Sequence, residues 1–461
     1  MYKILKDLKI AITGSEHKFT SGSLNRAIFM LAVPMVLEMV MESLFAVVDI
    51  YFVSKVSTNA VATIGLTESV IMLVFAIAIG ISMAASAMVA RRIGENKPEE
   101  AANAAWQAIL IGIAISAVIG ISGLVYASDI LRVMGGSEEL ITEGKNYTRW
   151  MFGGNITIML LFLINAVFRG AGDASLAMRT LWLANGINII LDPILIHGFG
   201  PIPAMGVEGA AIATTIGRSV GVMYQLYFLF NQKSVVSIRR HNMVVNLELI
   251  KRLLKVSLGG ISQYLIGTAS WIFLVRILSV FGSEVVAGYT ISFRIIMFTI
   301  LPAWGLANAA ATLVGQNLGA NKPDRAERAV WLSSYANLIF MVFVSITIWL
   351  FASPIISFFN AEGQVLETGI LSLKYISAGY VLLSYGMVMS QAFNGAGDTK
   401  TPTKINFMVY WVFQLPLAYV LSVMLNFGSE GVFITMVSSI SLAAIIFVIS
   451  FKQGKWKSTK I

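Results

Sequence analysis

The sequence contains no cysteine and few charged residues. Without cysteine, the chain cannot form disulfide bonds, zinc–thiolate sites or iron–sulfur clusters. Charged residues make up 12% of its 461 residues, whereas soluble domains carry about 25%. Hydrophobic residues reach 57%, and the mean hydropathy is +0.78. This composition excludes an ordinary soluble domain and predicts an all-α polytopic membrane protein.

Motifs for several kinds of chemistry are also missing. The sequence has no Gly-Lys loop for nucleotide phosphates, no cluster of metal ligands and no nucleophile–base constellation. It also lacks the paired DDxxD motifs that an intramembrane prenyl transferase would need. We therefore expect no enzymatic activity and no cofactor. A transporter with this sequence would have to use an ion gradient instead of ATP.

Apolar stretches long enough to cross a bilayer, which takes roughly 20 residues, occur twelve times. The first 26 residues are polar and basic and do not resemble a cleaved signal peptide. The twelve predicted spans centre on residues 27–53, 61–90, 101–127, 150–168, 181–198, 207–230, 253–281, 286–314, 329–351, 369–393, 405–425 and 431–451.

The net charge is +9, and the distribution of the basic residues indicates the membrane topology. Basic residues gather in the cytoplasmic loops of membrane proteins. If both termini are cytoplasmic, the cytoplasmic segments hold 24 of the 33 Lys and Arg residues. We therefore expect a multi-pass protein of the cell inner (cytoplasmic) membrane with both termini inside. The basic charge then gives no reason to expect a nucleic-acid partner.

The chain contains an internal repeat with an offset of 225 residues. Residues 83–106 align without a gap on residues 308–331, and FRGAGD at 168–173 matches FNGAGD at 393–398. We call two positions related by this offset repeat-equivalent. The predicted units are a cytoplasmic segment (1–26), an N-terminal six-helix bundle (27–230), a cytoplasmic connector (231–252), a C-terminal six-helix bundle (253–451) and a cytoplasmic tail (452–461).

Each half has six predicted spans, so both halves cross the membrane in the same direction. Transporters with such parallel repeats bind substrate near the membrane midplane between the halves and rock one half against the other. The repeat therefore indicates alternating access and disfavours a passive channel.

Acidic residues within the spans belong to the first half only. They are Glu38, Glu42, Asp49, Glu68 and Asp192, and the repeat-equivalent residues are Gln263, Gly267, Leu274, Phe293 and Leu417. An ionisable side chain within a membrane span costs several kcal/mol and usually has a function. We therefore predict that the first half carries the cation chemistry.

Asn188 and Asp192 lie one helical turn apart and share a helix face. Pro193 follows at once, so we expect that helix to bend there, and Pro34 should bend the first span in the same way. Thr214 in the sixth span is placed to reach the interior that Asp192 faces.

Crowded carboxylates in a dry site cannot all be ionised, so one of them could carry a proton in exchange for another cation. Oxygen ligands from Asp, Asn and Thr would equally suit Na⁺, and the sequence does not choose between H⁺ and Na⁺. The structural alternative is that each acid pairs with a base within the spans, such as Arg218 or Arg276, and only holds helices together.

Over nearly its whole length, the sequence resembles the multidrug and toxic compound extrusion (MATE) transporters. The resemblance rests on VPMVLEMVMESLFAVVDIYFV (33–53), NGINIILDPILI (185–196) followed by GVEGAAIATT (206–215), and LVGQNLGANKP (313–323). It implies two six-helix bundles in a V, which export organic cations in exchange for Na⁺ or H⁺. It also implies a cation site, with Na⁺ as one candidate metal, at Asp49, Asn188 and Asp192 with Thr214 or Thr215.

Some family members use an acid in the seventh span, where this chain has Gln263. The resemblance therefore implies the branch that relies on acids of the N-terminal half. Pro34, Glu38, Glu42, Glu68 and Gln263 are our candidates for substrate contact or gating.

Our leading hypothesis is a cation-coupled antiporter for small amphipathic cationic drugs that works in the lipid bilayer as a monomer. The alternative is a flippase for lipid-linked precursors, since related folds move such lipids.

Overall fold

The computed structural model describes residues 2–14, 19–53 and 55–461, and its regular elements are helices. The first half consists of α1 (Tyr2–Thr13), α2 (Leu24–Val53), α3 (Thr58–Gly94), α4 (Pro98–Val133), α5 (Glu138–Gly153), α6 (Asn155–Ala171), α7 (Ala174–His197) and α8 (Gly206–Phe230).

The connector contains η1 (Arg240–Asn242) and leads into the second half. That half consists of α9 (Leu247–Leu278), η2 (Ser279–Phe281), α10 (Ser283–Gly319), α11 (Pro323–Ser357), α12 (Gly363–Ala378), α13 (Tyr380–Ala396), α14 (Lys400–Asn406), η3 (Phe407–Gln414), α15 (Leu415–Tyr419), η4 (Val420–Met424), α16 (Gly428–Lys452) and η5 (Lys455–Ser458).

The helices follow the twelve predicted spans. Within the described residues, ten continuous helical stretches are long and apolar enough to cross a membrane. α8 and the α12–α13 pair occupy the other two predicted positions. The all-α fold with two bundles is therefore confirmed.

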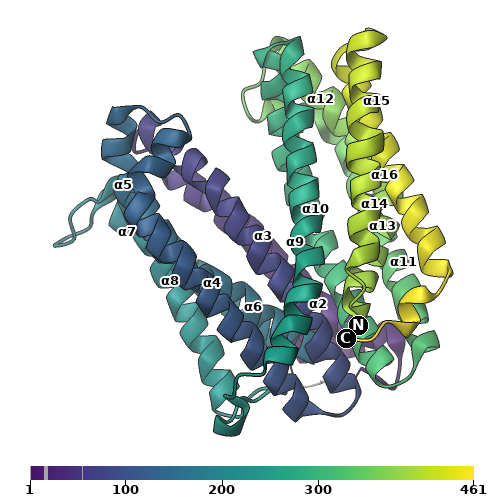
Figure 1. Cartoon of the computed structure of the whole chain (residues 1–461). Coiled ribbons are helices and arrows are strands. Elements are labelled where there is room, and N and C mark those ends of the chain that lie inside the picture. Colours follow the sequence, from purple (N-terminus) through teal and green to yellow (C-terminus); the bar gives the residue numbers. More distant parts are fainter. Residues whose placement is uncertain (1, 15–18, 54) are drawn as a thin grey trace.

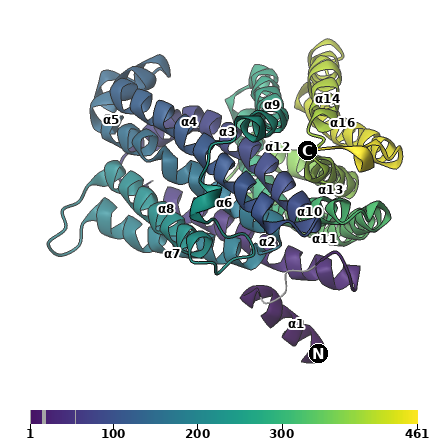
Figure 2. The same ribbon diagram turned by 60° about the horizontal axis from the view of Figure 1, so that its bottom comes forward.

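The two halves form the arms of a V (Figure 1). α2–α8 lie in one arm and α9–α16 in the other, and the arms diverge away from the end at which both termini lie. α1 lies at the edge of the molecule beside α2, as Figure 2 shows. The arms contact each other through α2 and α3 on one side and α9 and α10 on the other.

Interruptions in the helices recur at repeat-equivalent positions. α5 and α6 are separated at Gly154, and α12 and α13 at Gly379. The backbone departs from helical dihedral angles at Tyr126 within α4 and at Phe351 within α11. The two halves therefore share local backbone detail as well as helix order.

The predicted proline positions lie inside continuous helices. Pro34 lies inside α2 and Pro193 inside α7. In the second half, the helix equivalent to α7 contains two π-helical segments, η3 and η4, on either side of α15, which includes Pro416. π-helical turns absorb a missing or displaced backbone hydrogen bond.

The narrow end of the V is closed by direct backbone contact between α3 and α10. A methyl group at Gly94 would overlap the carbonyl of Gln316, and one at Gly319 would overlap the carbonyl of Arg91. Gly94 and Gly319 are repeat-equivalent, as are Arg91 and Gln316. In each half, the repeat-equivalent glycine therefore lets its helix approach the other half closely.

Segments outside the bundles also join the halves at the narrow end. Arg325 of α11 donates to the carbonyl oxygens of Phe19, Ser21 and Gly22 before α2. In the reciprocal contact, Arg91 of α3 donates to the carbonyl oxygen of Thr459 at 2.8 Å. The segment before the first span and the tail after the last one thus each contact the opposite half.

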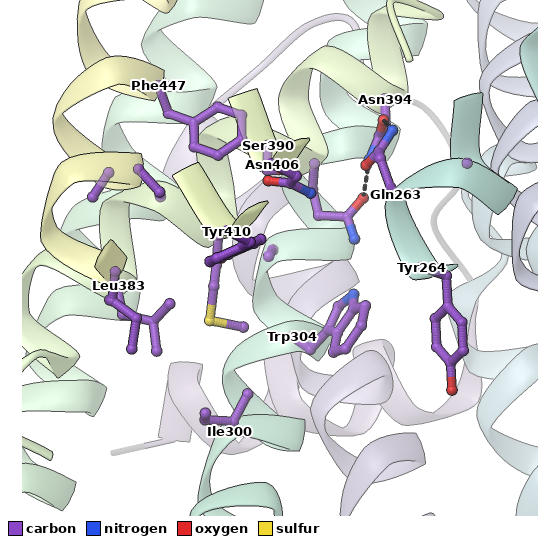
Figure 3. A pocket seen from close by; sticks show the side chains of 18 of the residues that line it. Gln263, Tyr264, Ile300, Trp304, Leu383, Ser390, Asn394, Asn406, Tyr410 and Phe447 are labelled. Atoms are coloured by element: carbon purple, nitrogen blue, oxygen red, sulfur yellow. Dashed lines mark hydrogen bonds between the residues drawn. The ribbon is translucent and has the colours of Figure 1, made fainter. Parts of the chain in front are cut away.

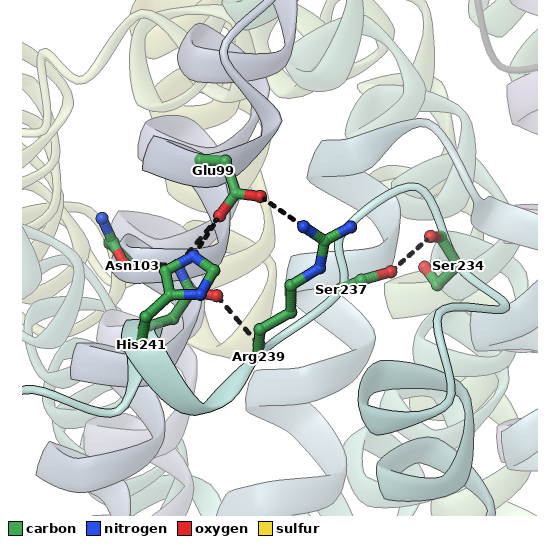
Figure 4. A network of polar contacts seen from close by, with 7 residues as sticks. Glu99, Asn103, Ser234, Ser237, Arg239 and His241 are labelled. Carbon is green, nitrogen blue, oxygen red and sulfur yellow. Dashed lines mark hydrogen bonds and ion pairs between the residues drawn. The ribbon is translucent and has the colours of Figure 1, made fainter.

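The connector is attached to the start of α4 by a polar network around Glu99 (Figure 4). His241, Asn242 and Arg239 lie 2.9, 3.2 and 3.4 Å from the Glu99 carboxylate oxygens. α9 begins at Leu247, inside the range assigned to the connector from the sequence, because the Asn246 side chain caps its first turn at Leu249 N.

Candidate functional site

One face of α7 carries a row of buried polar side chains. Asn185, Asn188 and Asp192 follow at helical spacing and all are buried. Asn188 Nδ2 donates to Asp192 Oδ1 at 3.4 Å and to Thr214 Oγ1 of α8 at 3.0 Å. The fold therefore brings together three of the residues that we predict to bind a cation.

Asp49 of α2 is the fourth predicted ligand, and its carboxylate interacts electrostatically with Asp192. Among the described residues, Asp49 Oδ1, Asn188 Oδ1 and Asp192 Oδ2 have no hydrogen-bond partner, and all three atoms are buried. A buried acceptor without a donor costs about 1–3 kcal/mol. The group of possible ligand oxygens, from two carboxylates, an amide and a hydroxyl, therefore fits H⁺ or Na⁺.

Two residues near this group were not predicted as site members. The Tyr147 hydroxyl of α5 is buried and lies within electrostatic range of Asp49, Asp192 and Glu68. The guanidinium of Arg218 in α8 interacts electrostatically with the Asp49 carboxylate. Arg218 was named from the sequence only as a structural partner. Tyr147 gave no sequence signal, because it lies in a polar stretch before the predicted fourth span.

A cavity of about 450 Å³ lies between the halves, and we call it the main cavity because both halves line it. α2 and α3 contribute three acids to its wall, Glu38, Glu42 and Glu68. α10 and α13 contribute side chains such as Trp304 and Asn394 from the other half. The three acidic substrate candidates of the first half therefore line one cavity.

Two of these acids have partners within the first half. Arg169 Nη1 donates to Glu38 Oε1 at 2.6 Å, and Asn185 Nδ2 donates to Glu42 Oε2 at 3.0 Å. The base that pairs with Glu38 is therefore Arg169, whereas Arg276 is exposed on α9. FRGAGD differs from FNGAGD at Arg169, so the repeat alignment contained a signal for this residue.

A second cavity of about 250 Å³ is lined mainly by the C-terminal half, with Ile79 and Met83 of α3 at its edge (Figure 3). Its polar side chains include Gln263, Tyr264, Asn394, Asn406 and Tyr410. None of the described residues that line it is acidic. Tyr264 and Trp304 line both cavities, so the two spaces adjoin.

Pro34, the remaining candidate, is buried beside the contact between the halves. Its neighbour Met35 packs its carbonyl group against Gly305 of α10. Pro34 therefore lies where α2 meets the opposite half, outside the wall of the main cavity.

Within the described part of the chain, no three His, Cys, Asp or Glu side chains form a group that could hold a metal ion. The candidate site is therefore the mixed group of carboxylate, amide and hydroxyl oxygens on α2, α7 and α8.

The sequence of this chain matches a known protein family and several named relatives. The family model described as MatE matches residues 34–194 and 256–420. The "Probable multidrug resistance protein NorM" of Thermotoga maritima is 28% identical over 440 residues, covering 95% of this chain and 94% of that protein. The "Multidrug export protein MepA" of Staphylococcus aureus is 23% identical over 430 residues, covering 93% of each.

A solved structure shows the same fold. The outward-facing conformation of a multidrug resistance MATE family transporter of the MOP superfamily superposes with a TM-score of 0.90 at 28% identity, covering 96% of this chain and 99% of that one. The molecule is thus a multi-pass membrane transporter. The chain belongs to the MATE family, which confirms the resemblance found in its sequence.

Proposed function

We propose that this protein is a secondary active multidrug efflux transporter that exports amphipathic organic cations in exchange for H⁺ or Na⁺. The observation that carries the proposal is the group of three buried acceptor oxygens on Asp49, Asn188 and Asp192 without a donor among the described residues. A proton would convert one carboxylate oxygen into a donor. Na⁺ would instead be held by the oxygen atoms, as hard cations are.

The main cavity supports an organic cation as the exported substrate. Its wall combines three acids with apolar and aromatic side chains, including Met39, Met83 and Phe162. Flexible methionines adapt to ligands of different shape, and carboxylates attract positive charge. The multidrug names of the relatives support the same substrate class.

The charge distribution supports cytoplasmic termini in the cell inner membrane. The narrow end of the V, where both termini lie, would then face the cytoplasm, and the wide end would face outward. The similarity to an outward-facing family member agrees with this orientation. We propose a monomer, because the ion site and both cavities are built from one chain.

α7 connects the ion site to the substrate cavity. Asn185 donates to Glu42 on the cavity wall, and one turn along the same helix Asn188 contacts Asp192 and Thr214. Ion binding between Asp49 and Asp192 would draw α2 toward α7, bend α2 near Pro34 and narrow the cavity beside Glu42. The organic cation would then leave outward, and rocking of the halves would reset the cycle.

A flippase for lipid-linked precursors is less compatible with the cavity. A pyrophosphate headgroup needs a cationic wall, whereas the main cavity has three acids and, among the described residues, one base. That base, Arg169, is already bound to Glu38.

The test is ethidium transport in proteoliposomes with a Na⁺ gradient and a pH gradient imposed separately. We expect at least one gradient to drive ethidium against its own gradient, and protein-free liposomes to show no such transport. The gradient that works identifies the coupling ion. Transport driven by neither gradient would contradict the proposal.

A further inference from the structure

The Glu38–Arg169 ion pair borders the main cavity and leaves one acceptor free. Glu38 is only 2% exposed, and its Oε1 accepts from Arg169 Nη1 at 2.6 Å and from Asn165 Nδ2 at 3.2 Å. Its Oε2 is buried and has no hydrogen-bond partner among the described residues. Both members of the pair line the cavity. A half-satisfied carboxylate is therefore held at the edge of the substrate space.

The C-terminal half makes the same contact without charge. Gln263 is repeat-equivalent to Glu38, and Asn394 is repeat-equivalent to Arg169. Gln263 Nε2 donates to Asn394 Oδ1 at 3.0 Å, and Asn394 Nδ2 donates to Gln263 Oε1 at 3.3 Å (Figure 3). In the second half, an amide pair therefore joins the two equivalent helices.

Charge at this position consequently needs a reason other than helix packing. Two charges buried together lose hydration that their attraction often fails to repay. The amide pair of the second half avoids that cost. The charged pair of the first half lies in the wall that also carries Glu42 and Glu68.

Arg169 also lies where the cavity meets the contact between the halves. Thr312 Oγ1 and Gln316 Nε2, both of α10, donate to the backbone carbonyl oxygens of Arg169 and Gly170, each at 3.1 Å. The end of α6 is thereby fixed to the opposite half, while the Arg169 side chain extends to Glu38 on α2. Release of the guanidinium would free a carboxylate without breaking these backbone contacts.

We propose that Glu38 and Arg169 form a displaceable ion pair that makes the main cavity select for positive charge. An organic cation replaces the Arg169 guanidinium at the Glu38 carboxylate, and Arg169 re-forms the pair when the cation leaves. A neutral molecule has no charge with which to replace Arg169, and an anion is repelled by the acids. This inference rests on the proposed export of organic cations and identifies the residues that select them.

The test compares equilibrium binding of ethidium with binding of an uncharged phenanthridine of the same ring system. Both are measured by fluorescence on purified protein without any ion gradient. The central variant combines Glu38→Gln with Arg169→Asn, which reproduces the amide pair that the second half already tolerates. We expect its Kd for ethidium to rise about tenfold, while its Kd for the neutral compound stays unchanged.

Single variants separate the two roles. Arg169→Asn leaves Glu38 without its competitor, so ethidium should bind about tenfold more tightly and dissociate more slowly. Glu38→Gln removes the binding charge and should weaken ethidium at least as much as the double variant. The matched control in the other half is Ser270→Ala, which removes a buried hydrogen bond to Gln414 Oε1 at 3.1 Å outside the walls of both cavities. It should leave the preference for ethidium over the neutral compound unchanged.

Two results would overturn the inference and leave the proposed function standing. One is an unchanged ethidium Kd in the double variant. The other is equal weakening of ethidium and the neutral compound, which would mean that cavity shape and not charge had changed. If the unmodified protein binds no ethidium, both the inference and the proposed cationic substrate class are wrong. A failure of ion coupling alone would appear in the proteoliposome experiment and leave these Kd values unaffected.

Discussion

The two halves of this transporter share a backbone but differ in polarity. Helix interruptions at Gly154 and Tyr126 recur at Gly379 and Phe351. Yet Asp192, 0% exposed in α7, has Leu417 as its equivalent. Since the second half folds the same way without these acids, the fold does not require them. We therefore interpret the acids as functional residues.

The same comparison distinguishes three kinds of position. At the proposed ion site, the carboxylates and the amide have no polar equivalents in the second half. At the Glu38–Arg169 contact, the geometry is shared and the charge is not. At the narrow end, the Gly94 and Gly319 contacts are the same in both halves. Variants at repeat-equivalent positions should therefore have different effects at the ion site and at the Glu38–Arg169 contact. At the two glycine contacts they should have the same effect.

The largest expected effect is at the ion site. Asp192→Asn removes the carboxylate and keeps the side-chain shape, so ion-driven ethidium transport should fall to the background of protein-free liposomes. Leu417→Asn places the same side chain at the equivalent position and should retain most of the transport. Normal membrane expression and thermal stability of both proteins are the controls. Undiminished transport by Asp192→Asn would show that the asymmetry of the halves is unrelated to coupling.

The next effect concerns the contact that the halves share. Gly94→Ala and Gly319→Ala each place a methyl group against a carbonyl of the other half. Overpacking of this kind costs about 1–3 kcal/mol. Both variants should destabilise closure of the narrow end to a similar extent, as measured by spin-label distances across that end. The absence of native cysteine allows labels to be introduced at chosen pairs of positions.

Gly267→Ala is the control for that experiment, because a methyl group there would meet nothing within 4 Å. It should leave the distances unchanged. A large shift with Gly94→Ala but none with Gly319→Ala would contradict the equivalence of the two contacts.

The smallest effect is expected at Thr214. Thr214→Ala removes the hydroxyl that accepts from Asn188, a loss of about 1 kcal/mol or about fivefold in affinity. The half-saturating concentration of the coupling ion in the transport assay should rise accordingly. Ser439 is the equivalent residue and donates to the Thr435 carbonyl of its own helix. Ser439→Ala should therefore leave that concentration unchanged, and equal effects of the two variants would argue against a ligand role for Thr214.

Much of the site could be predicted because its signals are local or repeated. Helical spacing places Asn188 and Asp192 on one face, and the alignment of the halves shows that both lack polar equivalents. The fold brings Thr214 to the same group. Their role in binding a coupling ion stays a prediction until transport is measured.

Pairing of side chains from distant segments could not be predicted in the same way. Glu38 binds Arg169, 131 positions along the chain, although Arg218 and Arg276 also lie within spans and were equally available from the sequence. Similarly, Tyr147 reaches the ion site from α5, which begins before the predicted fourth span.

The sequence by itself determined the number of spans, the two-bundle organisation and the restriction of the acids to one half. Hydropathy and the repeat are properties of the linear sequence, so they can be identified without knowing which helices are neighbours. Only the tertiary structure decided which acids are paired, which oxygens lack a donor and which glycines bring the halves together. Those outcomes depend on how helices pack, because a long side chain can reach several neighbours and packing selects one of them.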